Sequence, residues 1–154
     1  MEYDERLSVP LRWWVQGIML VATFWLAVIV ALPLAAAWTV TGAAGALVLA
    51  GLWAYGAQRL QVGDGVFRAG PARISVVHLG AAEALDAEST RRVAGRDADA
   101  RAYLLLRPYL KRGVRVEITD PADPTPYWLV GTRRPDALVQ ALEAVSHEPA
   151  DPRR

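Results

Sequence analysis

The sequence has no cysteine, and it has no charged residue between Arg12 and Arg59. The first absence excludes disulfide frameworks, zinc thiolate sites and thiol nucleophiles. The second argues against a soluble fold for residues 13–58, because a soluble core does not require so long an uncharged segment, whereas the centre of a bilayer penalises every charge. Composition therefore predicts a membrane segment followed by a soluble part.

Recognisable catalytic and cofactor motifs are also missing. The chain has no zinc-protease, P-loop or dinucleotide-binding fingerprint, and no serine in a nucleophile-elbow context. His78 is interpreted as a strand residue, His147 lies near the C-terminus, and Asp97 and Asp99 are interpreted as solvated loop acids. We therefore expect no enzyme activity, no metal and no cofactor. Lys111 is the only lysine, and the arginines are interspersed with acids, which argues against nucleic-acid binding.

The uncharged segment is long enough for two membrane spans of roughly 20 residues each and a tight turn. We place the spans at about residues 13–32 and 38–58, with the turn over residues 33–37, since Pro33 disfavours helix at the residue before it. Tryptophan and tyrosine mark the span ends, as is typical of the headgroup region. One long kinked helix would overshoot the bilayer, and a cleavable signal peptide does not fit the acidic N-terminus.

The placement of basic residues predicts the orientation of this hairpin. The turn carries no basic residue. Arginines flank the hairpin on both sides: Arg6, Arg12, Arg59, Arg68 and Arg73. Both termini should therefore be cytoplasmic, in a multi-pass protein of the plasma membrane. Neither span contains an ionisable residue, so no ion or proton pathway is predicted.

The second span carries small residues at every fourth position, on one helix face: Gly42, Ala46, Ala50 and Ala54. Small residues let two helix backbones approach closely in lipid. We call these residues the small-residue stripe. We interpret it as a packing face, either against the first span of the same chain or against a second copy in a homo-oligomer.

After Arg59 the sequence changes to short alternating runs, which are typical of strands. Gly63-Asp64-Gly65 predicts a β-hairpin turn, and Gly70-Pro71 predicts a second turn. Residues 86–101 are predicted as a loop with a helical turn. Strands are predicted at residues 60–62, 66–68, 72–79, 102–106, 114–119 and 127–132, with 82–85 as strand or turn.

A final helix is predicted from Pro135, because proline suits the first helical position and three apolar residues share one face: Leu138, Leu142 and Val145. About six or seven mainly antiparallel strands with a terminal helix predict a small barrel or orthogonal sandwich, the arrangement of a pleckstrin-homology-like fold. A curved sheet with a helix on one face is the alternative. The predicted parts are a cytoplasmic segment (1–12), the hairpin (13–58), the β domain with its helix (59–146) and a disordered tail (147–154).

Three stretches give the chain a resemblance to a known family: YDERLSVP at residues 3–10, running into two tryptophans, VGDGVFRAG at 62–70 and YWLVGTRRP at 127–135. They resemble actinobacterial two-span membrane proteins of unknown function with a pleckstrin-homology-like cytoplasmic domain. The resemblance covers nearly the whole chain up to Val145. It implies a fold and a compartment, and it supplies no catalytic residues.

The most suggestive polar feature of the soluble part is a basic loop, in which three basic residues surround an apolar tip: Arg107, Tyr109, Lys111 and Arg112. Such a loop fits a docking surface for a protein, or for anionic lipid headgroups, where each basic residue adds on the order of 1 kcal/mol. A solvated loop without a partner is the plain alternative. We expect a membrane-tethered domain that docks a protein partner at this loop or at a sheet edge, with headgroup binding as the alternative function.

Overall fold

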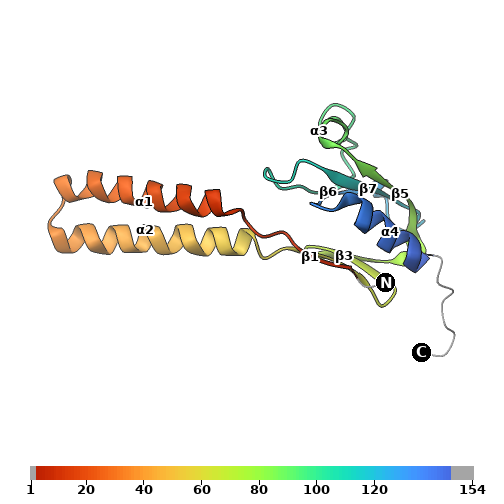
Figure 1. Cartoon of the computed structure of the whole chain (residues 1–154), viewed down its shortest axis with the longest axis horizontal. Helices are drawn as coiled ribbons and strands as arrows, with labels where there is room; N and C mark the ends of the chain where they lie inside the picture. Colours follow the sequence, from red (N-terminus) through yellow and green to blue (C-terminus); the bar gives the residue numbers. More distant parts are fainter. Residues whose placement is uncertain (1–2, 147–154) are drawn as a thin grey trace. The chain divides into compact units, whose positions relative to one another are not determined.

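The computed structural model describes residues 3–146, and the chain divides into two compact units (Figure 1). One unit is a helical hairpin of residues 7–58. The other is a β domain that contains residues 59–146 together with the short segment 3–6, which precedes the hairpin in the sequence. The predicted disordered tail, with His147, lies outside the described residues.

The hairpin consists of two apolar helices joined by a very short turn: α1 (Leu11–Ala31) and α2 (Leu34–Tyr55). With mean hydropathies of 2.1 and 1.6, both helices are long and apolar enough to cross a membrane. The turn is limited to Leu32 and Pro33, so the prediction that it extends over residues 33–37 is wrong. Pro33 accepts the first hydrogen bond of α2, from Ala37 N at 2.9 Å, and the N–H that proline lacks is not needed there.

A glycine and two aromatic pairs set the contact between α1 and α2. A Cβ at Gly17 would lie 3.1 Å from a side chain of α2, so this glycine permits the close approach of the helices. Trp13 stacks on Tyr55 at one end of the hairpin, with ring centroids 6.3 Å apart. Trp25 packs against Trp38 at 5.4 Å, so this mid-span tryptophan faces the other helix of the hairpin.

The first sheet of the β domain has four antiparallel strands in the order β1-β2-β3-β4. Their bounds are Tyr3–Arg6 (β1), Arg59–Gly63 (β2), Val66–Ala69 (β3) and Ala72–Ser75 (β4). The predicted β-hairpin is confirmed, since Asp64 and Gly65 link β2 to β3 with φ values of 50° and 69°, as a two-residue hairpin turn requires. Residues 1–12 were predicted as a segment apart from the β domain. The pairing of strand β1 with β2 corrects this prediction.

Strands β1 and β2 connect the β domain to the two ends of the hairpin. Arg6 pairs with Arg59 in the antiparallel register, and the whole hairpin occupies the sequence between them. In topological terms, α1 and α2 are therefore an insertion into the connection between two paired strands.

The second sheet has the order β5-β7-β8-β6, in which β6 runs parallel to β8 and the other pairs are antiparallel. A 3-10 turn (Val76–His78, η1) precedes this sheet, so the predicted strand 72–79 is interrupted. Helix α3 (Ala87–Ala94) replaces part of the predicted loop, and Asp86 caps it by accepting a hydrogen bond from Ser89 N at 2.7 Å. The strands are Leu79–Leu85 (β5), Tyr103–Leu105 (β6), Gly113–Ile118 (β7) and Tyr127–Gly131 (β8).

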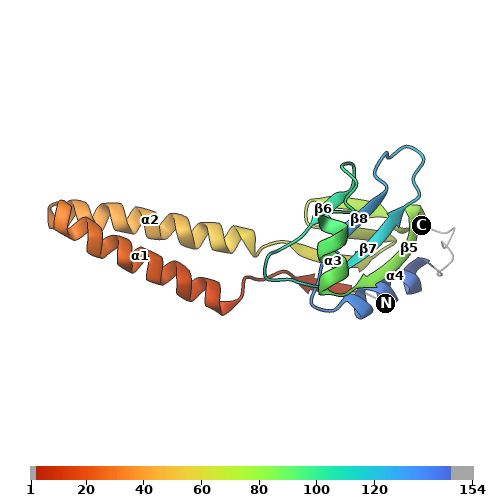
Figure 2. The same cartoon turned by 90° about the horizontal axis from the view of Figure 1, so that it is seen from above.

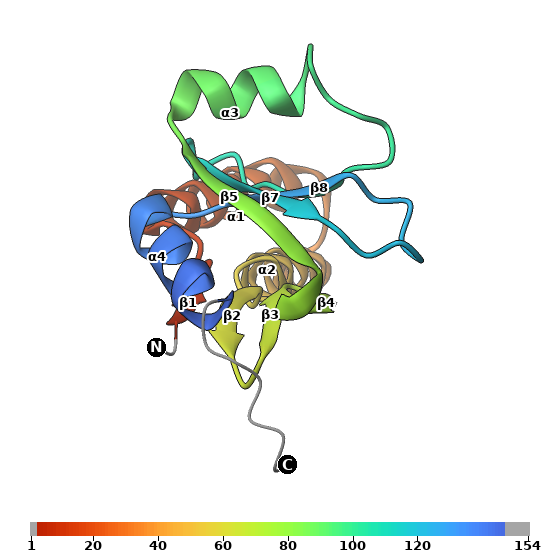
Figure 3. The ribbon, with the colours of Figure 1, turned by 90° about the vertical axis from the view of Figure 1, so that its right-hand side faces the viewer.

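Within the β domain the two sheets face each other, and helix α4 (Pro135–Ser146) closes one open side between them (Figure 2, Figure 3). Phe67 of the first sheet lies 5.7 Å from Trp128 of the second, between ring centroids. Leu138 and Leu142 of α4 are buried, so the apolar face predicted for the final helix is confirmed. Helix α3 covers the outer face of the second sheet (Figure 3).

A buried carboxylate ties β1 to the segment before α4. Glu5 is 5% exposed, and it accepts hydrogen bonds from the Tyr3 hydroxyl at 2.6 Å and from the Thr132 hydroxyl. Its other oxygen accepts a bond from Arg133 N at 3.1 Å. Burial and the hydrogen bond to Glu5 raise the pKa of Tyr3 to about 12, so Tyr3 stays a donor over the physiological range. We call these four residues the Glu5 cluster.

Candidate functional site

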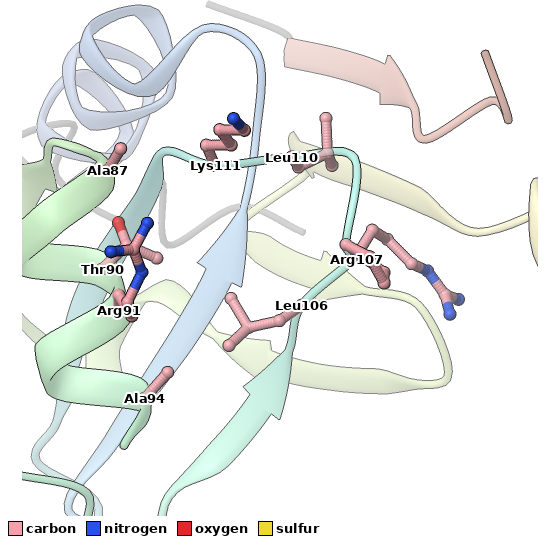
Figure 4. A pocket seen from close by; sticks show the side chains of 9 residues that line it. Ala87, Thr90, Arg91, Ala94, Leu106, Arg107, Leu110 and Lys111 are labelled. Carbon is pink, nitrogen blue, oxygen red and sulfur yellow. The ribbon is translucent and has the colours of Figure 1, made fainter. Parts of the chain in front are cut away.

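A hollow of about 390 Å³ lies in the β domain between α3 and the segment that links β6 to β7 (Figure 4). Ligand sites in proteins usually have volumes of about 300–1,000 Å³, so the hollow is large enough for a small group or a few side chains. We call it the α3 hollow. Its lining residues are Ala87, Thr90, Arg91, Ala94, Leu106, Arg107, Pro108, Leu110 and Lys111.

The walls of the α3 hollow are held by packing on the second sheet. Val93 and Ala94 of α3 pack against buried residues of β5 and β8. Leu106 packs on the same buried residues from the opposite wall. A hydrogen bond from Leu110 N to Arg107 O, 2.8 Å long, closes a tight turn in that wall. Both walls are therefore fixed by the domain core and by local backbone bonds.

Thr90 lines the hollow with a hydroxyl that has no partner. The residue is 5% exposed, and no hydrogen-bonding group for its Oγ1 lies within residues 3–146. Its methyl group packs toward β7, 3.5 Å from where a Cβ on Gly113 would lie. A buried hydroxyl left unpaired costs about 1–3 kcal/mol, so a ligand whose acceptor reached this hydroxyl, which is itself buried at the wall of the hollow, would gain stabilisation.

The rim of the hollow is basic. Arg91 of α3 and Lys111 are exposed, and within the described chain neither forms an ion pair with a carboxylate. No acidic residue lines the hollow. A hydroxyl donor, two cations and apolar walls together favour a carboxylate or phosphate group carried on an apolar body.

The predicted basic loop is only partly assembled at this hollow. Arg107 and Lys111 line it, but the guanidinium of Arg107 points away from α3 (Figure 4). Arg112 instead donates a hydrogen bond to Arg133 O at 3.1 Å. Tyr109 is half-buried and does not line the hollow. Of the four residues, the structure therefore places only Arg107 and Lys111 at this hollow.

Sequence reasoning missed the contribution of α3 to the hollow, because residues 86–101 were predicted as a loop with only a helical turn. A usable signal was nevertheless present. Asp86 is a favoured N-cap residue, and it is followed by residues that are buried or half-buried at helical spacing: Ala87, Thr90 and Ala94.

The small-residue stripe of α2 does not pack against α1. All of its members are exposed: Gly42, Ala46, Ala50 and Ala54. Helix α2 approaches α1 with other residues, since Gly45 and Val48 lie near Val21 and Gly17. The interpretation that the stripe packs on the first span is therefore wrong, and its contact with a second copy stays a prediction.

A second surface rich in arginine lies where the chain leaves β1 and enters β2, and two of its arginines are ion-paired, Arg59 with Asp4 at 3.7 Å and Arg133 with Glu5 at 3.9 Å. Arg133 donates a hydrogen bond to Arg6 O at 3.2 Å, and Arg112 donates to Arg133 O. Arg59 is the strand partner of Arg6. The side chains of these four arginines are all exposed. We call them the arginine cluster, and in the sequence residues 7–10 alone separate its member Arg6 from α1.

The comparisons with known proteins concern this architecture as a whole. A family model described as "Protein of unknown function (DUF3093)" matches residues 2–142. No curated protein and no solved structure matches the chain significantly. The family match spans the hairpin, both sheets and most of α4, in agreement with the resemblance to a family of unknown function. The chain therefore belongs to the DUF3093 family.

Proposed function

We propose that this protein is a non-enzymatic, membrane-anchored docking module. In this proposal the hairpin spans the plasma membrane with both of its ends in the cytoplasm. The β domain is then displayed at the cytoplasmic face, where the α3 hollow takes an acidic, partly apolar segment of a protein partner. The α3 hollow is the observation that carries the proposal.

The chemistry of the α3 hollow supports a peptide carboxylate as its ligand. The unpartnered Thr90 hydroxyl supplies a directional donor, and Arg91 and Lys111 supply charge. The apolar walls suit the side chain of a neighbouring residue in the same segment. Hydrogen bonds to charged groups contribute about 1.5–3 kcal/mol each, and burial of an apolar side chain against the walls has to add to them to offset the cost of association.

The proposal includes a pleckstrin-homology-like description of the β domain. Two facing sheets and a C-terminal helix that closes one side support it. The parallel strand β6 and the inserted helix α3 are departures from the simple order of strands followed by one helix. Helix α3 and the segment that follows β6 line the α3 hollow. The proposed docking site therefore lies where the domain departs from the simple order.

Topology is the first prediction. A reporter that is active only in the cytoplasm should work at the C-terminus and fail when it is inserted between Leu32 and Pro33. The flanking arginines favour the inner side, and the pairing of β1 with β2 requires both ends of the hairpin to lie on one side. A reporter that is active only outside the cytoplasm, if it works at the C-terminus, would contradict the proposed orientation.

Partner capture by full-length variants tests the docking site. The double substitution Arg91→Glu and Lys111→Glu should weaken binding of the captured partner at least about tenfold, because it removes two charged contacts. Thr90→Val, which keeps the shape, should weaken binding by a smaller factor. Partner bound to the solubilised chain would be quantified by mass spectrometry and its affinity measured by titration.

The matched control is Arg92→Glu, which changes the charge of the same helix at an exposed residue that does not line the hollow. Equal loss with Arg92→Glu would show a general charge effect and remove the α3 hollow from the proposal. Unchanged binding in all variants would place the docking surface elsewhere.

Anionic lipid headgroups are the second candidate ligand of the domain, and the arginine cluster favours them. Each basic residue near an anionic leaflet adds on the order of 1 kcal/mol. The short connection from Arg6 to α1 keeps this residue close to the headgroups if α1 spans the bilayer. Nanodiscs with and without anionic lipid separate the two functions, since only headgroup binding predicts lipid-dependent protection of the arginine cluster from hydrogen exchange.

A further inference from the structure

A groove of about 340 Å³ runs along one flank of the hairpin, between α1 and α2. We call it the hairpin groove, and its lining includes Val21 and Trp25 of α1 and Thr41, Gly45 and Leu49 of α2. Gly45 explains part of the space, because even a Cβ at this position would only reach van der Waals contact with Val21, at 3.5 Å. The groove lies wholly within the hairpin.

Two polar groups in the hairpin groove lack hydrogen-bond partners. Thr41 is 7% exposed, and neither its hydroxyl nor Trp25 Nε1 has a partner among residues 3–146. The exposed threonines of the hairpin behave differently, since Thr23 and Thr39 each donate to the carbonyl four residues earlier, at 2.9 Å. The buried threonine thus keeps its proton available, and Trp25 can only donate.

The depth of these groups limits where an acceptor can come from. Helices of 21 and 22 residues match a hydrocarbon core of about 30 Å. At a rise of about 1.5 Å per residue, Trp25 and Thr41 lie roughly 10–12 Å from the turn, inside the hydrocarbon rather than at the ester level. Water and headgroups are absent at that depth, so an acceptor from outside the hairpin would have to come from another protein segment.

The small-residue stripe of a second copy can provide such a segment. Within one copy, the stripe lies beside the hairpin groove. Gly42, Ala46 and Ala50 each follow a groove-lining residue of α2 by one position, which is a rotation of about 100° around the helix. A Cβ at Gly42 would meet no neighbouring atom within 4 Å. Exposed glycine and alanine leave helix carbonyls open to a second donor.

We infer that two copies of this chain pair through the hairpin, with the small-residue stripe of each copy seated over the hairpin groove of the other. Thr41 and Trp25 then donate hydrogen bonds to backbone carbonyls of the second copy. Each hairpin carries both the hairpin groove and the small-residue stripe that would fit it. Such a surface is suited to a two-fold pair, in which the contact between stripe and groove forms twice. This inference rests on the proposed membrane insertion of the hairpin.

Thiol cross-linking of the full chain in liposomes tests the pairing. The sequence has no cysteine, so Ala46→Cys introduces a single thiol at the stripe. Oxidation should link most of this variant into a covalent dimer. The control is Leu20→Cys, which is also an exposed position, at a similar distance from the turn and outside the lining of the hairpin groove. Equal cross-linking of both variants, or of neither, would overturn the inference.

Energy transfer between labelled copies at increasing lipid dilution tests the hydrogen bond. Thr41→Val should lower the association constant about eightfold, because the symmetric pair loses two interhelical hydrogen bonds that are each worth about threefold in a membrane, whereas Thr41→Ser should retain it. Ala46→Leu should lower it at least about tenfold, because a bulky side chain prevents close approach. Unchanged association in Thr41→Val and Ala46→Leu would exclude this interface.

Two further outcomes separate a failure of the proposed function from a failure of the pairing alone. If alkaline carbonate extracts the chain from membranes, the hairpin does not span and the proposed function fails together with this inference. If the chain stays in the membrane as a monomer and native mass spectrometry shows a retained phospholipid, the groove is a lipid site. That result overturns the pairing while the proposed function stands.

Discussion

Replacing Leu142 with aspartate is expected to unfold the β domain while the hairpin stays intact. Leu142 is 2% exposed, and the helix that carries it packs on β5, β7 and β2. Removal of a buried leucine side chain alone costs about 2–5 kcal/mol, and an unpaired buried carboxylate adds to that cost. A domain of this size has a total stability of about 5–15 kcal/mol, so most of it would be lost.

Limited proteolysis of the full chain in detergent measures this effect. In the Leu142→Asp variant, the β domain should be digested at a protease concentration that leaves the native domain whole, while a fragment that contains α1 and α2 survives. Gln140→Asp is the matched control, because Gln140 is an exposed residue of the same helix. Equal resistance of Leu142→Asp and the native chain would mean that α4 does not stabilise the domain.

Replacing Glu5 with alanine is expected to be the second most damaging change. The substitution leaves the Thr132 hydroxyl and Arg133 N without their acceptor, and it removes the ion pair of Glu5 with Arg133 at 3.9 Å. A buried donor left without an acceptor costs about 1–3 kcal/mol, whereas loss of the ion pair adds little because the Arg133 side chain is 43% exposed. Strand β1 should therefore detach, and the segment before α4 should lose protection from hydrogen exchange.

Asp4→Ala is the control for this prediction. Asp4 is the neighbouring acid on β1, and its ion pair with Arg59 is half-exposed, with an N–O distance of 3.7 Å. Exposed pairs contribute about 0–1 kcal/mol, so the thermal midpoint of the domain should hardly change. Combining Glu5→Ala with Thr132→Val should cost less than the sum of the single changes, because they share one network. Full additivity would show that the Glu5 cluster does not act as a unit.

The features that sequence predicted best depend on local signals. The uncharged run identified two long apolar helices because charge is costly across a whole bilayer, and Pro33 marked the turn. Gly63-Asp64-Gly65 identified the β2–β3 turn because few residues accept positive φ. The apolar face of α4 was visible in its spacing. In each case the residues that decide the structure are close together in the sequence.

The features that sequence could not predict depend on contacts between distant residues. Tyr3–Arg6 is too short and too polar to be recognised as a strand, and its partner β2 begins only after the hairpin. The parallel pairing of β6 with β8 likewise has no local signature. Thr90 became a candidate site residue only when α3 was seen packed on the second sheet, because an unpaired hydroxyl is defined by its surroundings.

The insertion of the hairpin between β1 and β2 has a consequence for biosynthesis. Strand β1 leaves the ribosome first, yet its partner is made only after both apolar helices. If a single helix crossed the bilayer, β1 and β2 would end on opposite sides, and Glu5 could not reach Thr132. If the hairpin crosses the bilayer as proposed, the first sheet can be completed only in a chain with an even number of crossings, and a chain with one crossing would leave the domain incomplete.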